Sequence, residues 1–150
     1  VDLKKWRAMM AAYEGGGHAY HATMPTDALV GFRDAMLETK AMGFDAAKAA
    51  QWDLGRQVRA LLAARGVASV AAEGFTAPGV VVSFTEDPEI QTGAKFRTAG
   101  YQIAAGVPLQ VGEGADYRSF RLGLFGLDKL KDVPATVARL TAALEAAMPA

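Results

Sequence analysis

The 150-residue sequence contains no cysteine. A chain without cysteine has no disulfide framework, no thiolate metal ligand and no cysteine nucleophile. It also has no excess of either charge, since lysine plus arginine and aspartate plus glutamate both total 16. Proteins that bind nucleic acid or acidic membranes usually carry a basic excess or a basic stripe, so neither is an expected partner.

Long apolar runs are missing as well. Stretches such as Gly79 to Phe84 are far shorter than the roughly 20 residues that cross a bilayer. The start of the chain lacks the basic segment and apolar run of a secretory signal. A hydrophobic fraction of 51% with 21% charged residues is typical of an ordinary globular domain. We therefore expect a soluble, cytoplasmic protein with no membrane partner.

Helical spacing of apolar side chains dominates the first half of the sequence. Residues 1–13 are predicted to form a helix, which the three glycines at 15–17 end. A second helix is expected to begin near Thr26, after Pro25, and to end at Gly43. A third helix is predicted over residues 45–65.

Valine-rich segments and turn residues mark the second half. The predicted elements are strands at 67–71 and 79–85, a helix over 87–99, a short strand within 102–107, a strand at 117–125 and a last helix capped by Asp132. Residues 111–115 are expected to form a loop between the last two strands. This order predicts an α+β fold, with helices packed on one face of a small, mainly antiparallel sheet.

The segment Gly15-Gly16-Gly17-His18-Ala19-Tyr20-His21-Ala22-Thr23-Met24-Pro25 is the first place where chemistry is expected. Its backbone N–H groups and the hydroxyls of Tyr20 and Thr23 can donate to an anion ahead of a helix start. The lysine and glycine spacing of a P-loop are absent, so a plain linker is the alternative. His18 and His21 have no third ligand nearby, and we predict no metal site.

A second candidate lies in the predicted strand at 117–125. Alternation puts Arg118, Phe120, Leu122 and Leu124 on one largely apolar face and Tyr117, Ser119, Arg121 and Gly123 on the other. A guanidinium beside a glycine suits bidentate capture of a carboxylate, and a solvated arginine is the alternative. The small residues Ala104-Ala105-Gly106 indicate a tight turn or a close approach of another group.

Taken together, these motifs resemble the class V family of fold-type I pyridoxal-phosphate aminotransferases, in its alanine–glyoxylate and serine–pyruvate branch. That branch has a Tyr-His-x-Thr-x-Pro motif, matched at residues 20–25, and an Arg-x-Gly-x-x-Gly strand, matched at residues 121–126. The resemblance covers essentially the whole chain. Where the family often has a glycine-rich turn, this chain has Ala104-Ala105-Gly106. Cysteine desulfurases share this fold but need a cysteine nucleophile, which this chain lacks.

The resemblance implies a role for three residues. Tyr20 and Thr23 would bind the coenzyme phosphate of a neighbouring subunit in a homodimer or higher homo-oligomer, and Arg121 would bind the carboxylate of the amino-acid substrate. The coenzyme, pyridoxal 5'-phosphate, would be the electron sink of the reaction. The implied activity transfers an amino group from a small L-amino acid of the alanine or serine type to a 2-oxo acid of the glyoxylate or pyruvate type.

The family's Schiff-base lysine lies upstream of the Tyr-His-x-Thr-x-Pro motif. Only Lys4 and Lys5 precede Tyr20, and neither is assigned a catalytic role. By resemblance, residues 1–24 would be the tail end of the large coenzyme-binding domain and residues 25–150 the small C-terminal domain. We therefore expect the C-terminal part of an enzyme, inactive on its own. The alternative is a catalytically inert α+β module for binding or dimerisation.

Overall fold

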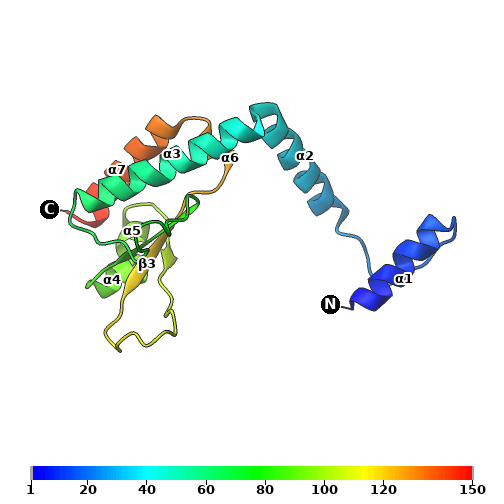
Figure 1. Ribbon diagram of the computed structural model, residues 1–150, viewed down its shortest axis with the longest axis horizontal. Coiled ribbons are helices and arrows are strands. Elements are labelled where there is room, and N and C mark those ends of the chain that lie inside the picture. The colour runs from blue at the N-terminus through cyan, green and yellow to red at the C-terminus, as the bar shows by residue number, and fades with distance from the viewer. Residues whose placement is uncertain (1, 150) are drawn as a thin grey trace. The chain divides into compact units, whose positions relative to one another are not determined.

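A computed structural model describes residues 2–149. Over these residues the chain forms seven helices and a three-stranded antiparallel sheet, which confirms the predicted α+β class (Figure 1). The described residues divide into two compact units, one ending at Ala41 and the other beginning at Met42. No helix within residues 2–149 is long and apolar enough to cross a membrane. The domain boundary predicted between residues 24 and 25 stays a prediction.

The first unit contains helix α1 (Leu3–Glu14) and nearly all of helix α2 (Thr26–Met42). The Asp2 carboxylate caps α1 by accepting a hydrogen bond from the Lys5 N–H at 3.1 Å. The glycines at 15–17 end α1, as predicted. Neither Leu3–Glu14 nor Thr26–Met42 contains a buried residue. Local signals therefore define both helices without a core between them.

The second unit is built on a sheet in the order β1-β3-β2, with β1 at Val80–Phe84, β2 at Ala104–Ala105 and β3 at Ser119–Gly123. Both neighbours of β3 run antiparallel to it. The strand predicted at 67–71 forms only one isolated bridge, between Ser69 and Ser83. That segment still runs along β1, because Val70 N–H donates to the Val82 carbonyl and Phe84 N–H to the Ala68 carbonyl.

Five helices accompany the sheet in this unit: α3 (Phe44–Ala63), α4 (Pro88–Gln91), α5 (Ala94–Thr98), α6 (Leu127–Leu130) and α7 (Val133–Ala147). The single helix predicted over 87–99 is therefore wrong. Gly93 divides it into α4 and α5, because its φ of 75° lies in the left-handed region that ends a helix. Asp132 caps α7 as predicted, accepting from Ala135 N–H at 2.9 Å.

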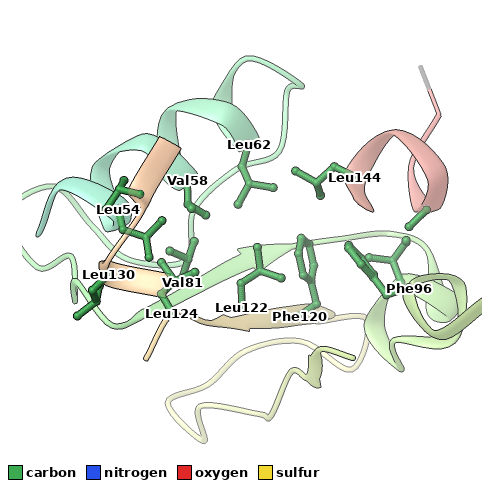
Figure 2. Packing of buried hydrophobic residues seen from close by; sticks show 13 residues of the cluster. Leu54, Val58, Leu62, Val81, Phe96, Phe120, Leu122, Leu124, Leu130 and Leu144 are labelled. Atoms are coloured by element: carbon green, nitrogen blue, oxygen red, sulfur yellow. The ribbon is translucent and has the colours of Figure 1, made fainter. Parts of the chain in front are cut away.

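The hydrophobic core of the second unit lies between the helices and one face of the sheet (Figure 2). Figure 2 shows Val58 and Leu62 of α3 pointing toward Leu122 and Phe120 of β3. Phe120, Leu122 and Leu124 are buried, so the face predicted from alternation is confirmed. On the opposite face of β3, Ser119 is buried, Arg121 is half-buried and Gly123 is exposed.

Helix α3 also holds the segment that leads into β1. Gln51 Nε2 donates to the Pro78 carbonyl at 3.0 Å, and Arg59 Nη2 donates to the Ala77 carbonyl at 2.9 Å. Gly55 packs so closely that a Cβ there would lie 2.8 Å from the Pro78 carbonyl oxygen. Contacts to three successive turns of α3 thus fix where β1 starts, and with it the position of its neighbour β3.

Candidate functional site

The loop between α1 and α2 brings the two predicted phosphate-binding hydroxyls together. The Tyr20 hydroxyl and Thr23 Oγ1 lie 3.0 Å apart and share a hydrogen bond. Tyr20 is 73% exposed, so its hydroxyl is accessible to a ligand. Tyr20 and Thr23 are three residues apart, and the turn between them brings their hydroxyls together.

An apolar pocket of about 690 Å³ adjoins these hydroxyls within the first unit. Trp6, Met9 and Tyr13 of α1 line it together with Tyr20 and Thr23. The neighbouring histidines make ring contacts: His21 packs edge-on against Trp6, and His18 packs edge-on against Tyr13. Within residues 2–149, no group of three His, Asp or Glu side chains is arranged to hold a metal ion.

Arg121 lies on β3, opposite Val82 of β1 and Ala104 of β2. Its Nε donates to the Ala105 carbonyl at 2.8 Å. Its two Nη groups make no hydrogen bond or ion pair with any described residue. A Cβ at Gly123 would meet nothing within 4 Å, so the open space predicted beside the arginine is confirmed.

The site residues fall in both units. The structure brings Tyr20 and Thr23 together in the first unit and places Arg121 in the second. The first group offers neutral hydroxyl donors, and the second offers a cationic fork. Lys5, one of the two lysines before Tyr20, lies 4.0 Å from the Asp2 carboxylate. The described chain therefore offers neutral hydroxyl donors in the first unit and a cationic donor in the second.

Sequence reasoning did not assign a role to Ser119 and Tyr117. The hydroxyls of both are buried without a hydrogen-bond partner in the described part of the chain. Alternation had already grouped them with Arg121 on one face, and a serine inside a predicted strand was the available signal. The close approach expected at Ala104-Ala105-Gly106 is confirmed, because a Cβ at Gly106 would lie 2.0 Å from the Ser119 carbonyl oxygen.

Comparison with known proteins assigns no family to the chain. No protein-family model matches it, and no curated protein matches it.

Proposed function

We propose that this chain forms the C-terminal part of a class V pyridoxal-phosphate aminotransferase. The reaction would transfer an amino group from a small L-amino acid of the alanine or serine type to a 2-oxo acid of the glyoxylate or pyruvate type. One observation carries the proposal: Arg121 presents a guanidinium fork whose Nη groups have no partner among residues 2–149. A cationic fork of this kind is suited to a ligand carboxylate.

The surroundings of Arg121 support this role in two ways. The hydrogen bond from Nε to the Ala105 carbonyl fixes the orientation of the guanidinium plane, while the Nη groups stay available. Its neighbours Val82, Ala104 and Gly123 carry no charge that would compete with a carboxylate. A bidentate arginine–carboxylate pair then orients the substrate Cα, and orientation of this kind is a large part of catalysis.

Tyr20 and Thr23 are suited to one side of a phosphate site. Two hydroxyls 3.0 Å apart can each donate to an oxygen of the same phosphate group once the hydrogen bond between them is exchanged for bonds to the phosphate. Because both are neutral, the charge of the phosphate must be balanced by other groups. By the family resemblance, this phosphate belongs to the coenzyme of a neighbouring subunit, so the proposal includes a homodimer or higher homo-oligomer. Pyridoxal phosphate, when bound, supplies the electron sink.

The proposal leaves this chain without a catalytic residue of its own. The coenzyme-binding lysine belongs, in the family, to the large domain that precedes the Tyr-His-x-Thr-x-Pro motif. The residues of this chain bind and orient: Arg121 the substrate, Tyr20 and Thr23 the phosphate. A cytoplasmic location is part of the proposal, and a chain without cysteine is compatible with that reducing compartment.

Substitution of Arg121 tests the proposal directly. In a protein that joins this chain to a lysine-bearing large domain of the family, Arg121→Ala should lower kcat/KM for the amino acid by on the order of a hundredfold, because a charge-assisted bidentate bond is lost. Arg121→Lys should restore part of it. Arg97→Ala, which removes an exposed arginine of α5, is the control. An unchanged KM and kcat/KM for Arg121→Ala would show that this role is wrong.

A second experiment separates the enzyme from the inert module. Pyridoxal phosphate added to the chain alone should give neither a stoichiometric, borohydride-trappable adduct nor transamination. A trappable adduct with activity would mean that a lysine of this chain is catalytic. The inert dimerisation module is favoured by the exposed apolar side chains of α2, such as Phe32 and Met36. It would be supported if the joined protein has no transaminase activity.

A further inference from the structure

A cavity of about 350 Å³ lies beneath the loop that joins β2 to β3. Gln91 of α4, Gly106, Glu113, Tyr117 and Ser119 contribute to its walls. Small-molecule sites commonly have volumes of about 300–1,000 Å³, so this cavity can hold a compact molecule. It belongs entirely to the second unit.

Two residues of this wall, Tyr117 and Ser119, carry hydroxyl groups that lack hydrogen-bond partners in the described chain. Ser119 is 1% exposed, and both Ser119 Oγ and the Tyr117 hydroxyl oxygen are buried without a partner in the described chain. Buried polar groups are nearly always paired, because an unpaired one loses its bonds to water and gains none in return. Both groups belong to residues that line one cavity, so a molecule bound there is the available partner for their hydrogen bonds.

The backbone of the loop builds this arrangement. Gly106 N–H donates to the Ser119 carbonyl at 2.9 Å and draws the loop against β3. A Cβ at Gly106 would lie 2.1 Å from Ser119 Oγ, so only glycine permits the approach. The loop therefore shields the Ser119 side chain from bulk water, and the adjoining cavity keeps space for a ligand.

The charge of the wall limits the class of ligand. The Glu113 carboxylate accepts from Gln110 N–H at 2.7 Å and from Val111 N–H at 2.9 Å. The hydrogen bonds from Val111 and Gln110 lower the pKa of Glu113 from its ordinary value, so it is ionised at neutral pH. No lysine or arginine lines the cavity in the described chain. An anion would meet negative charge, and both Glu113 oxygens already have donors.

We propose that this cavity binds a small uncharged molecule that carries hydroxyl or carboxamide groups. The Ser119 and Tyr117 hydroxyls each act as donor or acceptor, and the Gln91 amide adds one group of each kind. The proposal does not depend on the transaminase assignment, because neither Arg121 nor the Tyr20–Thr23 pair is involved.

Titration of the isotope-labelled chain followed by NMR tests the proposal. Glycerol and acetamide are the neutral probes, and sodium acetate and methylammonium chloride are the charged ones. The neutral probes should shift the amide signals of Gly106, Gly114 and Tyr117 saturably, and the charged probes should not. Shifts that do not saturate with either neutral probe, as expected if the hydroxyls hold only water, would overturn the proposal. Equal binding of acetate would overturn it too.

Two variants sharpen the test. The double variant Ser119→Ala with Tyr117→Phe should weaken binding by about tenfold or more, because both hydrogen bonds are lost. Ala115→Leu places a larger side chain in the wall and should abolish binding with both hydroxyls intact. Ala138→Leu, at an exposed position of α7, is the matched control and should bind like the unsubstituted chain. If Ala115→Leu binds the neutral probes as tightly as the control, the cavity is not the site.

Discussion

The two units of this chain differ in where their apolar side chains lie. From Met42 onward, helices and sheet enclose a core in which Leu54, Val58, Phe96 and Leu144 are fully buried. Neither α1 nor α2 buries a residue, and Phe32 of α2 is 65% exposed. Caps and glycines can define a helix, but most helical stability in proteins comes from packing an apolar face. The helices of the first unit therefore lack the packing that stabilises the second unit.

Removing a core aromatic should have the largest effect. Phe120→Ala in β3 should lower the free energy of unfolding by about 3–5 kcal/mol, because it leaves a cavity beneath α3 and α7. Phe32→Ala in α2 should change it by less than about 0.5 kcal/mol, since surface substitutions usually do. Chemical denaturation measures both. Similar losses for the two variants would contradict the contrast between the units.

A pair of helical glycines sharpens the comparison. Gly55→Ala in α3 should cost about 1–3 kcal/mol, because its Cβ would lie 2.8 Å from the Pro78 carbonyl oxygen. Gly31→Ala in α2 meets nothing within 4 Å and should stabilise the helix by about 0.5–1 kcal/mol. Far-UV circular dichroism during thermal unfolding follows both. The prediction fails if the two substitutions act in the same direction.

Self-association should depend on the first unit. The exposed apolar side chains of α2 form a surface that favours contact between copies of the chain. Phe32→Glu together with Met36→Glu should shift sedimentation towards the monomer, while Ala138→Glu on α7 should leave it unchanged. If the unsubstituted chain sediments as a monomer over a wide concentration range, this surface does not cause association.

The smallest effect is expected from a surface ion pair. The Lys95 ammonium donates to the Asp87 carboxylate, which lowers the pKa of Asp87 and raises the pKa of Lys95. The stability from the lowered pKa is present above pH 3.8 and is lost as the pH falls further. The stability from the raised pKa is present below pH 10.5 and is lost as the pH rises further.

Lys95→Met tests this pair through the pH dependence of Tm. The variant should lose the alkaline part of the dependence that belongs to Lys95. It should keep part of the acid dependence, since Glu89 N–H and Ile90 N–H still donate to Asp87. Lys48→Met, in the exposed part of α3, is the control. An alkaline profile that is the same in Lys95→Met and the unsubstituted chain would contradict the assignment.

Local chemistry explains which parts of the fold could be predicted. Alternation identified the buried face of Phe120 and Leu122, and the carboxylate of Asp132 marked the start of α7. The helix over 87–99 was mispredicted because a single glycine inside an apolar pattern does not reveal its own φ. The segment at 67–71 has strand composition, but its pairing depends on how Arg59 and Gln51 place the residues before β1.

In the candidate sites too, local features could be predicted from the sequence, and features that depend on distant segments could not. Tyr20 and Thr23 are three residues apart, so their proximity could be predicted from a short sequence motif. The unpaired hydroxyl of Ser119 could not be predicted, because its burial depends on the close approach of Gly106, which follows β2 and is separated from Ser119 by a long loop. The role of Arg121 could be proposed, but its free Nη groups become evident only when every neighbouring side chain has been placed.

The short strand β2 has a consequence for how copies of this chain meet. A sheet with a long unpaired edge is a template on which a strand of another molecule can add, and this is a common start of aggregation. Here β2 offers only Ala104 and Ala105 at one edge, and residues 68–70 run along β1 at the other. The sheet is therefore poorly suited to growth from chain to chain.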